Sequence, residues 1–132
     1  MPVALDEVAR IAEGLPDVTV GERRGNRTWF VGGKAFAWER PFSKADLARF
    51  GEQPPPAGPI LAVRVADLHE KDAALIANPA AFFTIPHFDG YAAILVQLRK
   101  VTRRALVEAL REAWRVSCPL PPRPRKRSRR SA

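Results

Sequence analysis

Apolar side chains recur at helical spacing in three segments of the chain, residues 4–14, 67–78 and 102–117. Positions three and four apart share one face of an α-helix, so each segment predicts an amphipathic helix whose apolar side packs against the rest of the protein. A shorter segment, residues 43–50, begins with a serine followed three residues later by an aspartate, which is a helix-capping pattern. The second long helix is expected to bury Leu68, Leu75 and Ile76.

Apolar runs between these helices predict strands. The runs ILAVRV at 60–65, FFTIP at 82–86 and AAILVQL at 92–98 are typical of buried strands, and a short run at 18–20 leads into a polar turn at 21–26. The predicted order is helix, three strands, helix, two strands, helix, with a short inserted helix. Strands joined by tight turns favour an antiparallel sheet with helices on one face, so we predict a two-layer α+β fold.

The segment 27–38, RTWFVGGKAFAW, is the clearest hairpin in the sequence. Gly32-Gly33 can supply the positive φ angles that a two-residue hairpin turn requires. The resulting register places Trp29 opposite Phe36, with Phe30 on the opposite face from both. The core face of the hairpin is then expected to carry Trp29, Val31, Phe36 and Trp38.

The stretch TIPHFDGY at 84–91 holds the densest potential chemistry, because His87 and Asp89 could act as an acid–base pair. Asp89-Gly90 is also a strong hairpin-turn signal, and that register puts His87 opposite Ala92 at the edge of the sheet. A turn is therefore favoured over an active site, and no enzyme activity is predicted. The histidines lack the spacing of a metal site, so no metal or cofactor is predicted.

Length and composition place the chain among ordinary globular proteins. It has 132 residues, of which 46% are hydrophobic and 27% charged, which suits one domain with one core. The N-terminal segment lacks the basic and apolar regions of a signal peptide, and no apolar run is long enough for a membrane span, so a cytoplasmic location is expected. Cys118 is the only cysteine, which rules out an internal disulfide.

The net charge of +8 is concentrated at the C-terminus. The last ten residues hold six basic side chains and no acid, whereas the rest of the chain has sixteen basic against fourteen acidic residues. We therefore predict a domain over 1–120, with an insertion at 40–59 that contains the short helix and a proline-rich loop. A disordered basic tail is predicted over 121–132, and such a tail attracts polyanions non-specifically.

Three groups of basic residues are candidates for contacts with nucleic-acid phosphates. The first surrounds the first hairpin and consists of Arg23, Arg24, Arg27 and Lys34. The second precedes and opens the last helix and consists of Arg99, Lys100, Arg103 and Arg104. The third lies in the tail and consists of Arg123, Arg125, Lys126, Arg127, Arg129 and Arg130.

Two segments, GNRTWFVGGKAFAW at 25–38 and FFTIPHFDGYAAILVQL at 82–98, resemble the MmcQ/YjbR family of small bacterial proteins. The flanking helices, which end in GLPDVTVGER and AWRVSCP, follow the same pattern, so the resemblance covers residues 4–120. It implies an α+β fold with an antiparallel sheet and the family's usual label of a double-wing DNA-binding protein. The insertion at 40–59 and the basic tail depart from the family pattern.

The leading hypothesis is a non-enzymatic protein that binds DNA with low specificity, mainly through its phosphates. The alternative is a protein-interaction module that holds a partner helix or peptide on an open sheet face. A third hypothesis is an enzyme that uses His87 and Asp89. An exposed aromatic patch on the sheet would favour a protein partner, whereas arginines on that face would favour DNA.

Overall fold

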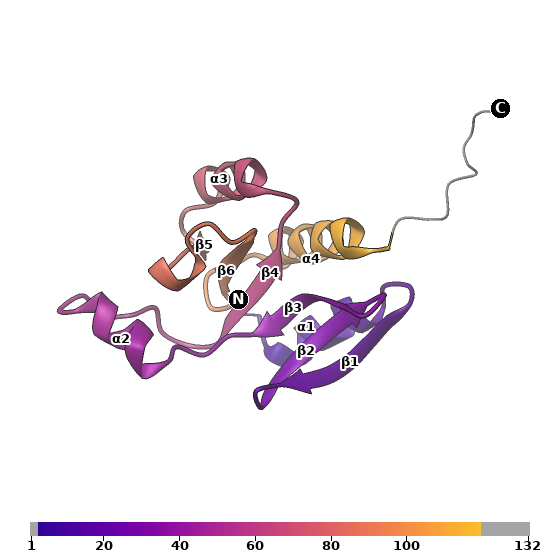
Figure 1. Cartoon of the computed structure of the whole chain (residues 1–132), viewed down its shortest axis with the longest axis horizontal. Helices are drawn as coiled ribbons and strands as arrows, with labels where there is room; N and C mark the ends of the chain where they lie inside the picture. The colour runs from indigo at the N-terminus through magenta and orange to yellow at the C-terminus, as the bar shows by residue number, and fades with distance from the viewer. Residues whose placement is uncertain (1–2, 120–132) are drawn as a thin grey trace.

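The computed structural model describes residues 3–119, so the predicted tail and its six basic candidates lie outside the described residues. No helix within this part of the chain is long and apolar enough to cross a membrane. The elements, shown in Figure 1, are α1 (Leu5–Glu13), β1 (Val18–Arg23), β2 (Asn26–Val31), β3 (Lys34–Glu39), α2 (Lys44–Phe50), β4 (Ile60–Arg64), α3 (Leu68–Ala77), β5 (Phe82–Phe83), the 3₁₀ turn η1 (Pro86–Phe88), β6 (Ala93–Gln97) and α4 (Arg103–Ser117).

The six strands form one antiparallel sheet in the order β1-β2-β3-β4-β6-β5, which confirms the α+β prediction. The predicted order had one strand too few, because four strands precede α3. The polar segment 21–26 is mostly paired within the β1–β2 ladder rather than looped. Only Arg24 and Gly25 form the turn, and both adopt positive φ angles, of 54° and 79°.

One face of the sheet, which we call the helical face, packs against α1, α3 and α4. The centre of its core is fully buried and combines sheet and helix side chains, among them Trp29, Leu61, Val96, Val8, Leu106 and Leu110. The helical spacing in the sequence indicates the correct buried sides of α1 and α4, because apolar residues on these helices meet the sheet along their whole length.

The buried side of α3 differs from the prediction. Leu68 and Ile76 are 48% and 79% exposed, whereas Lys71 is 5% exposed and Leu75 is half-buried. The Nζ of Lys71 donates hydrogen bonds to the carbonyl oxygens of Phe88 and Tyr91, at 2.5 and 2.8 Å. These two bonds compensate the burial of the amine. A charged residue therefore occupies the inward-facing position on α3, whereas the apolar pattern predicted that Leu68 and Ile76 would be buried.

The hairpin of β2 and β3 contains a β-bulge that the sequence prediction missed. The Gly32-Gly33 turn forms as expected, with φ angles of 59° and 80°. Beyond it the register shifts, so Trp29 pairs with Ala37 instead of Phe36. Because a bulge adds one residue to one strand, every later side chain on β3 changes face. Phe36 and Ala37 therefore both reach the helical-face core, and Trp38 turns to the opposite face.

The opposite face, which we call the second face, has a smaller core of its own. Its buried residues are Ile60, Ala62, Ile85, Phe88, Ala93 and Leu95. Phe42, which precedes α2, and Phe50, its last residue, pack on this cluster, so the inserted helix covers part of the second face away from α1 and α4 (Figure 1). Ser43 and Asp46 form the predicted capping box of α2. The face expected to be open is thus closed over β4 and β6.

Candidate functional site

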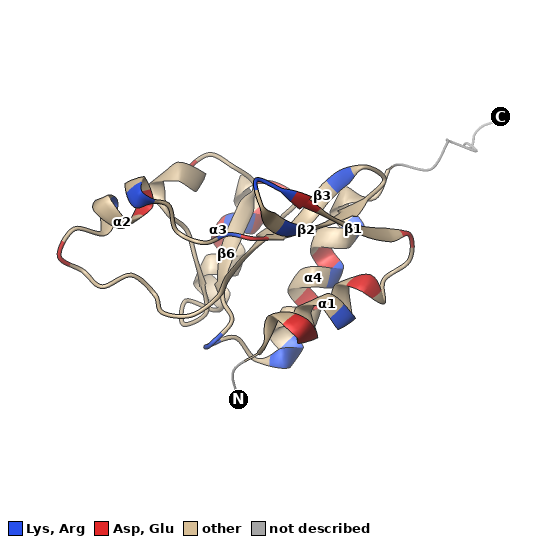
Figure 2. Ribbon diagram, turned by 90° about the horizontal axis from the view of Figure 1, so that it is seen from below, with Lys and Arg blue, Asp and Glu red and all other residues tan. Residues whose placement is uncertain are grey.

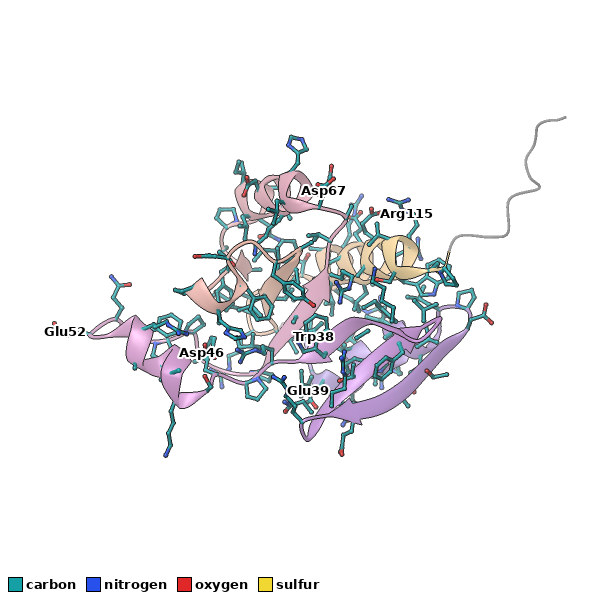
Figure 3. The ribbon with its side chains drawn as sticks, in the orientation of Figure 1. Trp38, Glu39, Asp46, Glu52, Asp67 and Arg115 are labelled. Atoms are coloured by element: carbon teal, nitrogen blue, oxygen red, sulfur yellow. The ribbon has the colours of Figure 1, made fainter. Side chains whose placement is uncertain are left out.

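A groove of about 830 Å³ lies on the second face, between the β1–β2 turn, the chain leading into α2, and the turn after η1. We call it the arginine–aromatic groove. Figure 3 labels three residues that border it, Trp38 and Glu39 on β3 and Asp46 on α2. Its other notable lining residues are Arg23, Arg24, Arg40, His87, Phe88 and Tyr91.

The floor of the groove is aromatic, and Arg64 of β4, which does not itself line the groove, lies beside two of its rings. The Arg64 guanidinium lies 5.8 Å from the ring centre of Trp38 and 5.5 Å from that of Tyr91. Arg64 also donates hydrogen bonds to the Tyr91 hydroxyl, at 3.1 Å, and to the carbonyl oxygen of Ala35, at 3.0 Å. No carboxylate among the described residues lies within 4 Å of Arg64, so its positive charge remains available to a ligand.

The rim at the β1–β2 turn carries two more arginines, Arg23 and Arg24, both exposed. The Arg23 guanidinium lies 6.0 Å from the ring centre of Phe30, which is half-buried on the same face. Within residues 3–119 neither arginine forms a salt bridge. Cation–π contacts at exposed sites contribute only about 0.5–1 kcal/mol, and they do not neutralise the cation.

The side of the groove formed by α2 is electrostatically compensated. Arg40 lies over the Phe88 ring, at 5.5 Å, and forms a 2.9 Å salt bridge with Asp46, whose side chain is 2% exposed. Arg49 is 3.7 Å from the same carboxylate. Burial by itself would raise the pKa of Asp46, but hydrogen bonds from Ser43 and Arg40 outweigh it and hold this pKa below its usual value. Unpaired positive charge is therefore concentrated away from α2.

Lys71 fixes the turn that presents Tyr91. Its two hydrogen bonds hold the carbonyl groups of Phe88 and Tyr91, and the rings of these two residues meet edge to face, with centres 5.6 Å apart. Burial lowers the pKa of Lys71, while the carboxylates of Asp89 and Asp72 oppose that shift. The Lys71 amine is buried, is occupied by these two hydrogen bonds and does not line the groove, so we assign it a structural role.

The TIPHFDGY stretch forms a longer connection than the predicted two-residue hairpin. Its flanking strand β5 is only two residues long, and η1 precedes the turn. Asp89-Gly90 does reverse the chain, because Gly90 has a φ of 77° and the Tyr91 N–H donates to the Phe88 carbonyl oxygen at 3.0 Å. His87 is exposed at the groove edge, and no hydrogen bond among the described residues joins it to Asp89.

Metal-binding residues do not gather in the described part of the chain: residues 3–119 contain no group of three or more His, Cys, Asp or Glu side chains that could hold an ion. Cys118 is a half-buried free thiol at the end of α4.

The structure divides the first predicted basic cluster. Arg23 and Arg24 line the groove at one end of β2, whereas Lys34, the first residue of β3, lies at the opposite end of that strand. At about 3.3 Å per residue, the two ends of β2 are roughly 20 Å apart. Arg27 is half-buried, and its backbone N–H donates to Glu39 at 2.8 Å. Sequence proximity grouped these four residues, but strand length separates them.

The second predicted cluster is partly neutralised, because two of its four cations have carboxylate partners. Arg103 pairs with Glu7 of α1 at 2.5 Å, and Arg104 lies 3.8 Å from Glu108. The side chain of Arg99 lies over the backbone of Gly58, while Lys100 is exposed. Figure 2 shows acidic and basic residues side by side along α1 and α4.

Sequence reasoning missed Trp38, Arg40, Arg64 and Tyr91 as site residues. One signal was present: Arg64 interrupts the apolar run ILAVRV, where a charged residue on a central strand requires a partner or a function. Trp38 and Arg40 are close in the sequence, but Tyr91 comes from a distant segment, and only the tertiary fold brings it beside them.

Comparison with known proteins agrees with this architecture, an α+β domain built on one antiparallel sheet. No family model matches the chain. The crystal structure of Deinococcus radiodurans protein DR2400, a DUF419 domain, matches 86% of this chain and 77% of that chain with a TM-score of 0.61. At 17% identity, this likeness shows the fold alone.

Sequence relatives are closer. Uncharacterized protein Rv2570 of Mycobacterium tuberculosis is 44% identical over 117 residues, which cover 86% of this chain and 88% of that protein. Uncharacterized protein Mb2600 of Mycobacterium bovis matches to the same extent. The chain belongs to the family of these mycobacterial proteins.

Proposed function

We propose that the protein binds DNA without catalysing a reaction, mainly through phosphate contacts made at the arginine–aromatic groove. The observation that carries this proposal is the presence of Arg23 and Arg24 at the rim of the groove, and of Arg64 beside its aromatic rings, without carboxylate partners among the described residues. Guanidinium groups bind phosphate oxygens through paired hydrogen bonds. The basic tail adds general attraction to the polyanion.

A family assignment supports the same function. We propose that the chain is a member of the MmcQ/YjbR family, for which DUF419 is another name. The sequence motifs at 25–38 and 82–98 and the DUF419 fold of DR2400 both support this assignment. The family's double-wing label is in keeping with DNA binding.

The arrangement of aromatic rings favours DNA over a protein partner. An exposed aromatic patch is the feature expected of a protein-interaction module. On the second face, however, Phe30 is accompanied by Arg23, and Trp38 and Tyr91 are accompanied by Arg64. Desolvating these guanidinium groups against an apolar peptide would cost free energy, whereas phosphates would retain their hydrogen bonds.

The test is fluorescence anisotropy of a labelled duplex, titrated with the full chain at several salt concentrations. We expect affinity to fall steeply with salt, and deletion of 123–132 to flatten that dependence, by up to about five units of logarithmic slope for six cations. In the shortened chain, the double variant Arg23→Ala/Arg24→Ala should weaken binding about tenfold.

The matched control is Arg103→Ala/Arg104→Ala. It removes the same charge, but from side chains that already bond Glu7 and Glu108, so a smaller loss is expected. An equal or larger loss would move the interface to the start of α4. If the intact chain bound neither duplex nor single-stranded DNA at low salt, the proposed function would be wrong.

A further inference from the structure

We propose that the arginine–aromatic groove is a base-stacking site for single-stranded DNA, and that the protein binds single strands more tightly than duplexes. This inference rests on the DNA binding proposed above and specifies the form of DNA that the site accepts. Its basis is the combination of a concave shape, a partly exposed aromatic floor, two arginines on the rim and a third arginine beside the floor's rings.

The first argument is the shape of the groove. A duplex keeps its base faces stacked inside and presents phosphates on its outer surface, so it can reach the exposed rim arginines, Arg23 and Arg24. The floor, which includes the half-buried Trp38, suits a thinner ligand. A hollow of about 830 Å³ lies within the size range of sites that enclose small ligands, which is enough for one or two nucleotides.

The second argument is the chemistry of the floor. Tyr91 is 40% exposed, and its ring centre lies 6.4 Å from that of the half-buried Trp38. Both rings line the groove, and the planar cation of Arg64 lies beside them without lining the groove itself. Unpaired bases stack on such surfaces whatever their identity, and this arrangement is typical of proteins that bind single strands without sequence preference. A duplex would leave these aromatic faces unused.

The third argument is that the floor is already ordered. Tyr91 is held by its edge contact with Phe88, by the hydrogen bond from Arg64 to its hydroxyl, and by Lys71 at its carbonyl oxygen. A side chain that is fixed before binding loses little conformational entropy when a base stacks on it. These supports come from three different elements, η1, β4 and α3, which converge on the same turn.

The experiment compares a labelled oligo(dT) of about 12 nucleotides with a duplex of equal length, using the full chain at one fixed salt concentration. We expect the oligo(dT) to bind more tightly. Tyr91→Ala should weaken oligo(dT) binding about tenfold and change duplex binding much less, because only the single strand stacks on the ring. Arg23→Ala/Arg24→Ala should weaken both probes.

The control variant is Tyr91→Phe, which keeps the ring and loses only the hydroxyl that accepts from Arg64. It should retain oligo(dT) binding, and it remains informative if Tyr91→Ala fails to fold. Tryptophan fluorescence gives a second measurement, because stacking on Trp38 should quench the emission. Trp29 is fully buried in the helical-face core, and Trp114 of α4 packs against the same core and does not line the groove. Neither should respond, so Trp38→Phe should abolish the quenching.

The outcomes separate the two proposals. Equal binding of both probes, with no effect of Tyr91→Ala and no quenching, would overturn the base-stacking site and leave DNA binding intact. Tighter binding of the duplex would do the same. Failure of the full chain to bind either probe at low salt would overturn both.

Discussion

The two faces of the sheet use arginine in different ways. On the helical face, Arg103 bonds a glutamate of α1, and Arg104 and Arg115 bond glutamates within α4. On the second face, Arg23 and Arg64 lie against aromatic rings and have no carboxylate partner among the described residues. An ion pair neutralises an arginine, whereas a ring orients it and leaves its charge available. The count of basic residues in a segment therefore says little about where an anion binds.

The faces also differ in how they are stabilised. The helical face has a continuous core formed by three helices, while the second face depends on a small apolar cluster and on polar contacts made by two buried charged residues, Lys71 and Asp46. Buried charges tolerate little change in their partners, because an unpaired one is strongly destabilising. The candidate site is thus built on the more easily disrupted side of the molecule.

The largest effect on stability is expected from breaking the helical-face core. Leu110→Ala removes a fully buried side chain of α4 and should lower the free energy of unfolding by about 3 kcal/mol, through lost apolar burial and the cavity left behind. Urea denaturation followed by circular dichroism measures it. Leu47→Ala, at a residue 44% exposed on α2, is the matched control and should change stability by about 0.5 kcal/mol or less. Equal losses would contradict the assignment of the main core to the helical face.

An intermediate effect is expected from Lys71→Met. This change leaves the carbonyl oxygens of Phe88 and Tyr91 without their buried donor, which should lower stability by about 2 kcal/mol. It should also weaken oligo(dT) binding, because the turn that presents Tyr91 loses its support. The same substitution at the exposed Lys34 should leave stability nearly unchanged. Unaltered stability of Lys71→Met would show that the amine does not hold the turn.

The smallest effect concerns Asp46 and depends on pH. Its folded-state pKa lies below the usual value of 3.8, so the folded protein binds fewer protons at this group than the unfolded chain. Its stabilising contribution is therefore complete above that value and is lost as the pH falls through the folded-state pKa. Asp46→Asn should cost about 1 kcal/mol at neutral pH and progressively less in acid.

Urea denaturation at neutral pH and near pH 3 compares this variant with the unmodified chain; the pH values bracket the usual carboxyl pKa of about 4. Glu52→Gln, at an exposed residue of the insertion, is the control and should show no such pH-dependent difference. A loss in Asp46→Asn that does not shrink in acid would contradict a depressed pKa.

Local sequence patterns were sufficient for most of the secondary structure. The helices, the Gly32-Gly33 turn and the capping box of α2 depend on interactions within a few residues, and each occurs where it was predicted. Errors arose where distant contacts decide. The bulge in β2–β3 reversed the face of Trp38, and partners from another segment buried Lys71 in place of Leu68.

The candidate site was only partly visible in the sequence. Arg23 and Arg24 were identified from local charge, but Lys34 was grouped with them although it lies at the far end of a strand. Arg103 was identified by the same criterion, and its partner Glu7 is distant in the chain. Charge density along a sequence cannot distinguish a paired arginine from an available one, because the pairing acid can come from any element.

The sequence by itself determined the α+β class, the helices, the Gly32-Gly33 turn, and the concentration of positive charge in the last ten residues. Spacing and turn residues act locally, so they can be interpreted without the fold. Only the tertiary structure decided which arginines remain available, because the register of β3 and the packing of α3 set the positions of Trp38 and Tyr91 beside Arg64. A binding surface made from three segments depends on contacts between them, which no single segment encodes.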